Sequence, residues 1–124
     1  MKYLYIALGG ALGSMARYWV GSAVGTRVQS RFPWGTFVVN MTACVVIGFV
    51  MEWLGKRSSL DPAFRFLIPV GFIGAYSTFS TFEWDALMTV RAGYFLTSAL
   101  YLAGSVVAGF IAVWAGARLG DWLG

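Results

Sequence analysis

The chain has 124 residues, of which 59% are hydrophobic and only 11% charged, and its mean hydropathy is +0.72. This composition leaves too little polar surface for a soluble globule and predicts an integral membrane protein. One cysteine and no histidine exclude a disulfide framework and the usual zinc or haem ligand sets. The net charge of +4 would suggest nucleic acid in a soluble chain, but the cations lie mostly at the ends of apolar stretches, where lipid headgroups favour them. We therefore expect a lipid bilayer, and no nucleic acid, as the partner of these charges.

Four apolar stretches follow one another along the chain, and each can cross the roughly 30 Å hydrocarbon core as a helix of about 20 residues. The first carries one charge, Arg17, and the other three carry none. The stretches lack the alternation of a lipid-facing barrel, and four short crossings could not close one. They are Tyr3 to Val24, Phe32 to Met51, Phe66 to Phe82 and Ala92 to Ala117. The chain is predicted to be an all-α integral membrane protein with four transmembrane helices in one domain, residues 1–124.

The basic residues of the chain give almost no orientation signal. The side of the N-terminus receives five of them, and the other side receives four: Lys2, Lys56, Arg57, Arg65 and Arg118 against Arg17, Arg27, Arg31 and Arg91. Near equality predicts insertion in both orientations and permits an antiparallel, dual-topology homodimer. If Arg17 is buried and does not contribute, five against three favours a cytoplasmic N-terminus, and both interpretations stay open. We expect Arg17 to be a vestibule residue or an anchor that extends towards the headgroups.

Small residues recur four apart, at the spacing that lets membrane helices approach closely. The pairs are Gly9 with Gly13, Gly21 with Gly25, Gly71 with Ala75, Gly104 with Ala108, and Gly116 with Gly120. These pairs predict helix-packing faces. A four-helix bundle fills its centre with side chains, so an aqueous pathway would most simply need a second copy of the chain.

The third stretch combines Pro69, Gly71 and Gly74 with a hydroxyl and phenylalanine triplet repeat, Ser77 to Phe82. Residues three apart share a helix face, so the repeat predicts two hydroxyl stripes and one phenylalanine stripe. Proline and glycine weaken helical hydrogen bonding and can free backbone carbonyls for a cation, as in broken transporter helices. From these residues alone, an ordinary proline kink is favoured over a broken helix.

These motifs together resemble the Fluc (CrcB) family of fluoride channels, which are small bacterial four-span proteins. The resemblance covers nearly the whole chain and rests on four blocks: Gly9 to Tyr18, Gly35 to Asn40, Gly71 to Gly74, and Ser77 to Phe82. The last block is highly specific, whereas the glycine-rich first block is weak by itself. The resemblance implies an antiparallel homodimer with two fluoride pathways, a structural sodium ion on the dimer axis, and a third helix broken near mid-membrane.

The resemblance also implies roles for individual residues. Gly74 and Ser77 correspond to positions whose backbone carbonyls bind the sodium ion. Tyr101 and Ser105 lie four apart on one face of the fourth helix, and their match to the pathway is less specific. The fluoride pathway is expected to use Asn40, Phe79, Ser80, Thr81, Phe82, Tyr101 and Ser105.

Four residues depart from the pattern of the family. Ala43 and Ala75 stand where glycine is usual, and their methyl groups are expected to be tolerated. Asp85 stands where many members carry glutamate, and Glu83 adds a second acid. The place of these two carboxylates relative to the pathway is left open.

The sequence predicts a passive channel in a bacterial inner membrane that lets cytoplasmic fluoride leave and so relieves its toxicity. Closely placed donors can replace the water of a small anion, and the positive edge of an aromatic ring attracts it without trapping it. No phosphate-binding glycine loop and no nucleophile with a histidine base is present, so an enzyme is not expected. A proton-coupled four-span drug exporter is the alternative, but its embedded carboxylate is missing because Glu52, Glu83 and Asp85 are expected near span ends. A non-transporting scaffold would leave the triplet repeat unexplained.

Overall fold

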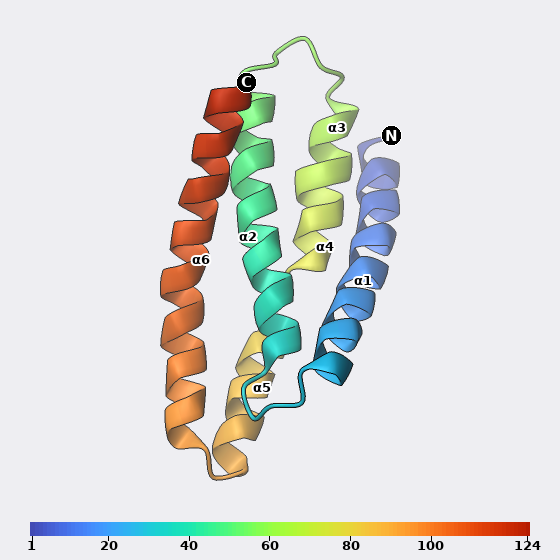
Figure 1. The fold of residues 1–124 in the computed structure, drawn as a ribbon. Coiled ribbons are helices and arrows are strands. Elements are labelled where there is room, and N and C mark those ends of the chain that lie inside the picture. Colours follow the sequence, from blue (N-terminus) through green and yellow to red (C-terminus); the bar gives the residue numbers. More distant parts are fainter.

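The computed structural model describes residues 1–124 and consists of helices without strands. Figure 1 shows them as a bundle in which successive long segments run in opposite directions, so that both termini lie at one end. The elements are α1 (Lys2–Arg27), α2 (Trp34–Gly55), α3 (Ala63–Arg65), the π-helix η1 (Phe66–Ile73), α4 (Gly74–Tyr76), α5 (Ser80–Arg91) and α6 (Phe95–Leu123). Together, α3 to α5 make up the third long segment of the bundle, which we call the third crossing, so the chain has the four helical segments that were predicted.

Glycine contacts bring α1 against η1. A Cβ atom on Gly9 would overlap the carbonyl oxygen of Leu67, and one on Gly13 would overlap that of Phe72. From the other side, a Cβ on Gly71 would lie 2.9 Å from the carbonyl oxygen of Ile6. Backbones can approach this closely only where the side chain is a hydrogen atom. The predicted packing roles of Gly9, Gly13 and Gly71 are therefore confirmed.

Close backbone contacts at glycines also join α2 to α6. Cβ atoms on Gly116 and Gly120 would collide with the backbone of α2, and one on Gly48 would collide with that of α6. Of the remaining predicted residues, Gly21 also packs closely, since a Cβ on Gly35 would lie 2.6 Å from its carbonyl oxygen, whereas Gly25 and Gly104 make no such contact within this chain. A Cβ on Gly25 or Gly104 would meet nothing within 4 Å, because these glycines face open space.

The third crossing is broken, as the family resemblance implied, whereas its residues alone had favoured an ordinary proline kink. Pro69 lies inside η1, where the wider helix accommodates a residue that cannot donate a backbone hydrogen bond. The helix continues to Tyr76 and then stops, because Ser77 is extended with a ψ of 156°. Helical structure resumes at Ser80. The stripes predicted for a continuous helix over Ser77 to Phe82 are therefore wrong, since only its last three residues are helical.

The crossing also extends further than the apolar stretch indicated. Because α5 runs to Arg91, Glu83 and Asp85 lie inside this half-helix, and the prediction that they lie at the end of a span is wrong. Glu83 is exposed on its surface, whereas Asp85 is half-buried. The acidic residues lowered the hydropathy of the segment and hid its second half from the sequence pattern.

Two of the helices, α2 and α6, are long and apolar enough to cross a membrane by length and composition alone. Large apolar side chains are exposed around the bundle, as a hydrocarbon solvent permits. The interior is small by comparison. One cluster contains Val39, Ala43, Ile73 and Tyr76, and a second contains Phe82, Ala86 and Tyr101.

Candidate functional site

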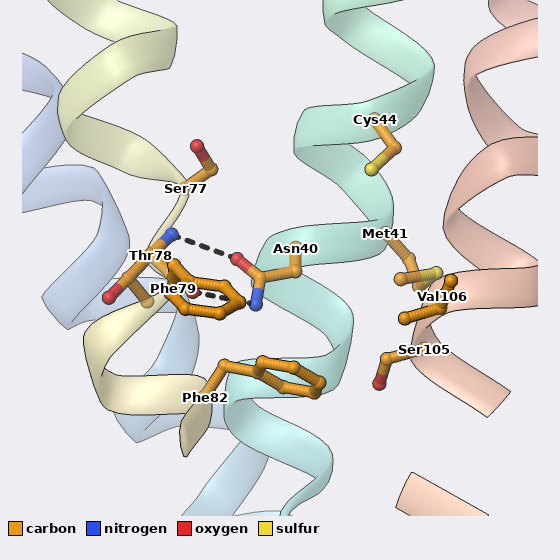
Figure 2. Close-up of a pocket in the computed structure, with 9 residues that line it drawn as sticks. All are labelled: Asn40, Met41, Cys44, Ser77, Thr78, Phe79, Phe82, Ser105 and Val106. Carbon is orange, nitrogen blue, oxygen red and sulfur yellow. Dashed lines mark hydrogen bonds between the residues drawn. The ribbon is translucent and has the colours of Figure 1, made fainter. Parts of the chain in front are cut away.

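The break in the third crossing is held by a single side chain of α2. Asn40 Nδ2 donates to the carbonyl oxygen of Thr78 at 3.0 Å, and the backbone N–H of Thr78 donates to Asn40 Oδ1 at 2.9 Å. Figure 2 shows the two bonds as a closed pair between the amide and the peptide. The side chain replaces the two helical hydrogen bonds that the break removes from Thr78. Asn40 therefore acts first on the backbone, with one amide hydrogen left for another acceptor.

Local hydrogen bonds complete both ends of the break. The N–H and the hydroxyl group of Ser77 both donate to the carbonyl oxygen of Ile73, at 3.1 and 3.2 Å. On the other side, the N–H of Thr81 donates to Thr78 Oγ1 at 3.2 Å, which satisfies one of the free donors at the start of α5. The carbonyl end of one half-helix thus meets the N–H end of the other.

Two carbonyl oxygens at the break remain available. Neither Gly74 nor Ser77 receives a hydrogen bond on its carbonyl oxygen, since the N–H of Thr78 is bound to Asn40 instead. Gly74 is exposed on the surface of the protomer. Free carbonyls at the C-terminal end of a half-helix are suitable ligands for a hard cation, but two of them do not complete a coordination shell.

A pocket of about 280 Å³ lies beside the break. Its walls come from α2, the break, α5 and α6, as Figure 2 shows. We call it the break pocket, and it is lined by Asn40, Met41, Cys44, Ser77, Thr78, Phe79, Phe82, Ser105 and Val106. Four of the seven residues predicted for an anion pathway meet here, namely Asn40, Phe79, Phe82 and Ser105.

The two phenylalanines of the break pocket differ in how they are held. Their ring centroids are 6.0 Å apart, with 47° between the ring planes. Phe82 is 7% exposed and packs on Tyr101 at 4.9 Å, which in turn meets the edge of Phe32 at 5.3 Å. Phe79 is 74% exposed and has no such support. Tyr101 lies behind Phe82 instead of in the wall of the pocket.

A second pocket, of about 250 Å³, lies on the α1 side of the break. We call it the Arg17 pocket, and it is lined by Arg17, Tyr18, Gly21, Ser22, Thr36, Val39, Thr78 and Thr81. Arg17 is half-buried and its Nε donates to the carbonyl oxygen of Ala75 at 3.2 Å. This inward contact differs from an anchor that extends to the headgroups and agrees with the vestibule alternative. Thr81 lines this pocket, whereas Ser80 is exposed and lines neither pocket.

The structure adds a contact that the sequence interpretation missed. The hydroxyl of Thr36 in the first turn of α2 donates to Asp85 Oδ2 at 2.5 Å. This bond ties α5 to α2 below the break, across 49 positions of sequence. A hydroxyl in the block Gly35 to Asn40 was the available signal, but nothing in the sequence paired it with Asp85. Further along α6, the hydroxyl oxygens of Tyr101 and Ser105 are buried without a hydrogen-bond partner.

The lining of the break pocket contains neutral donors and two phenylalanine rings, and no Asp, Glu, Lys or Arg. Such a lining can attract an anion through several weak contacts that allow it to leave again. A strong fixed charge in the wall would bind the anion and slow its exit. The break pocket is therefore suited to passage better than to storage.

Known proteins that resemble this chain are named as ion channels, in agreement with a pocket suited to passage. The family model described as CrcB-like protein, camphor resistance (CrcB), matches residues 4–117. A protein of Acidobacterium capsulatum named fluoride-specific ion channel FluC is 49% identical over 98% of this chain and 97% of its own length. Proteins with the same name from Solibacter usitatus and Chloroflexus aurantiacus are 50% and 37% identical, over 96% and 98% of this chain and 98% and 96% of their own lengths. The match extends over nearly the whole chain, which belongs to the CrcB family and is a membrane protein of that family.

Proposed function

We propose that this protein is a passive fluoride channel of a bacterial inner membrane, which lets fluoride leave the cytoplasm and relieves its toxicity. The observation that carries the proposal is the break pocket, in which Asn40, Phe79, Phe82 and Ser105 converge beside an interrupted helix. The names of the similar proteins support fluoride as the ion. We expect a channel instead of an enzyme, since the similar proteins are named fluoride-specific ion channels.

The chemistry of the pocket suits a small, strongly hydrated anion. Such an ion gives up water only where donors stand close enough to replace it. The second amide hydrogen of Asn40 and the hydroxyl of Ser105 are donors without a partner in the protomer. The ring edges of Phe79 and Phe82 add a positive electrostatic potential without a formal charge. Several weak contacts in series let the ion enter and leave along its electrochemical gradient.

We further propose that the working unit is an antiparallel homodimer with a sodium ion on its axis. Phe79 projects beyond the protomer at 74% exposure, so that a second copy would cover it and close the open side of the break pocket. The carbonyl oxygens of Gly74 and Ser77 are unpartnered, and Gly74 is at the surface. Two copies would supply four such oxygens, which is closer to the shell that a hard cation needs. The near balance of basic residues between the two ends supports insertion in both orientations.

One feature of the structure, a half-buried carboxylate, supports the alternative function of a proton-coupled exporter. Asp85 lies inside α5 and is half-buried, so an embedded carboxylate is present after all. Its Oδ2 accepts a hydrogen bond from the hydroxyl of Thr36, so one of its two oxygens is already occupied within the bundle. Membership of the CrcB family favours the channel. Fluoride efflux that does not change when the pH gradient is abolished would exclude the exporter.

The experiment that tests the proposal compares three phenylalanine substitutions in liposomes loaded with fluoride. We expect Phe79→Ile and Phe82→Ile to slow fluoride efflux at least tenfold while the dimer stays intact. Phe95→Ile is the matched control, because Phe95 is 73% exposed, like Phe79, but lies at the start of α6 away from the pocket. Unchanged efflux in both pocket variants would remove their assigned roles.

Sodium and orientation have separate tests. Replacing sodium by a large organic cation should lower the thermal stability of the purified dimer, and sodium should restore it. Equal stability in both salts would contradict the sodium proposal. Reporter fusions at Gly124 should be found on both sides of the membrane, whereas a single location would contradict dual topology.

A further inference from the structure

The far wall of the break pocket contains a thiol to which neither the sequence pattern nor the proposed function gives a role. Cys44 lies one helical turn beyond Asn40 on α2 and lines the same pocket. Figure 2 shows the amide of Asn40 directed towards the break and Cys44 on the side of α2 that is nearer to α6. The thiol is partly exposed and makes no hydrogen bond, although a bond to the carbonyl oxygen of Asn40 would be the ordinary solution for a cysteine inside a helix. Its donor therefore remains unused.

The space beside this thiol depends on a glycine of α6. A Cβ atom on Gly109 would lie 3.4 Å from Cys44 Sγ and 3.5 Å from Met41 Cε. The sulfur thus lies directly over the α6 backbone, where a larger side chain at position 109 would fill the space next to it. One side of the thiol therefore packs over α6, and Cys44 also lines the break pocket.

A second unused donor lies on the same wall. Ser105 comes one turn before Gly109 on α6, is only 8% exposed, and has no hydrogen-bond partner for its hydroxyl. Figure 2 shows this hydroxyl directed towards the side of the pocket on which Phe82 lies. A buried hydroxyl without a partner is unfavourable unless a polar occupant of the pocket completes it. The hydroxyl of Ser105 and the thiol of Cys44 together form a pair of free donors between α6 and α2.

We propose that Cys44 lines the ion pathway and that its S–H group faces the passing anion together with the Ser105 hydroxyl. This inference rests on the proposed function. It extends the pathway one helical turn beyond Asn40, towards Gly109. A group attached to the sulfur would enter the space that the ion uses and would close the pathway.

A methanethiosulfonate reagent provides the test, because Cys44 is the single cysteine of the chain. The reagent is sodium (2-sulfonatoethyl) methanethiosulfonate. The thiolate of Cys44 attacks the reagent, the S–S bond of the reagent breaks, and a new disulfide joins Sγ to the sulfur of the sulfonatoethylthio group. Methanesulfinate leaves with the electron pair, and the thiol proton passes to water. The sulfurs exchange partners, so no further oxidant or reductant is consumed.

The reagent is added to the full-length protein in fluoride-loaded liposomes, and labelling is measured by mass spectrometry alongside fluoride efflux. We expect labelled protein to release fluoride at least tenfold more slowly than unlabelled protein. Cys44→Ser has no thiol and should resist the reagent, so its efflux after the addition should equal its own efflux before it. The double variant Cys44→Ser, Ser58→Cys places the thiol in the exposed loop before α3 and should label without losing efflux.

The outcomes separate this inference from the proposed function. Complete labelling of Cys44 with unchanged efflux would show that the thiol lies outside the pathway, and so would a failure to label in conducting protein. A reagent that slows the Cys44→Ser variant equally would also overturn the assignment. Unmodified protein that releases no fluoride would instead remove the proposed function itself.

Discussion

Replacing Asn40 by alanine is the most informative single change at the break. The substitution removes both hydrogen bonds to Thr78, at 3.0 and 2.9 Å, and leaves the N–H and the carbonyl of that peptide without partners. Hydrogen bonds between membrane helices average about 0.6 kcal/mol and reach about 1.7 kcal/mol, so the pair contributes about 1 to 3 kcal/mol. A loss of about 2 kcal/mol lowers the equilibrium ratio of the intact to the opened break about 30-fold, since each 1.4 kcal/mol is a factor of ten in an equilibrium constant.

Two measurements follow this loss. We expect Asn40→Ala to slow fluoride efflux from liposomes at least tenfold and to lower the thermal midpoint of the protein in detergent. Hydrogen exchange gives the most local measurement, because the N–H of Thr78 is protected by Asn40 Oδ1 in the wild type and should exchange rapidly in the variant.

Thr42→Val is the matched control for this experiment. Thr42 lies on the same helix and its hydroxyl contacts Tyr76 Oη at 2.9 Å, so the variant removes a contact near the break without touching Thr78. One hydrogen bond of about 0.6 kcal/mol corresponds to about a threefold effect. Equal hydrogen exchange of the Thr78 amide in wild type and Asn40→Ala would contradict the claim that Asn40 holds the break through its two hydrogen bonds to Thr78. Lost efflux with unchanged exchange and stability would mean that Asn40 acts on the ion alone.

The remaining predictions concern packing and pH. Gly13→Val should lower stability by about 1 to 3 kcal/mol, because its side chain would enter the backbone of Phe72. Gly10→Val, where a Cβ meets nothing within 4 Å, is the control, and equal thermal midpoints for the two variants would contradict the packing. At the end of α6, Lys56 lies 2.5 Å from Asp121 and, through its hydrogen bond, lowers the pKa of that carboxyl below its usual value of 3.8. A lowered pKa stabilises the fold above the unfolded value, so this small contribution should persist at pH 5 to 7 and disappear only below about pH 4. A pH titration of thermal stability should therefore separate wild type from Asp121→Asn at neutral pH and merge them in acid, and a difference that grows in acid would contradict the sign.

The sequence predicted the four crossings because length and hydropathy decide them locally. It also predicted that Gly9, Gly13 and Gly71 lie on packing faces, since small residues four apart let helices approach closely, but it did not predict that these faces join α1 to η1. The exact form of the break could not be predicted in the same way. Its stability depends on Asn40, 38 positions away from Thr78, and a pattern within the third stretch cannot reveal such a partner.

The sequence analysis named residues that meet at the break pocket, but it did not predict how they are arranged there. Phe79 and Phe82 were expected as a helix stripe, but Phe79 precedes α5 and only Phe82 is packed inside the bundle. Asp85 was placed at the end of a span because charged residues lower hydropathy, although its bond to Thr36 holds it against α2. These differences arise from contacts between elements, which hydropathy and spacing do not record.

Fluoride-electrode recording from liposomes that contain the purified protein tests the central claim most directly. The proposal predicts rapid release of fluoride when a potassium ionophore balances the charge, with chloride retained and the rate independent of the pH gradient. Release no faster than from protein-free liposomes, or release that follows the pH gradient, would contradict a passive fluoride pathway at the broken helix.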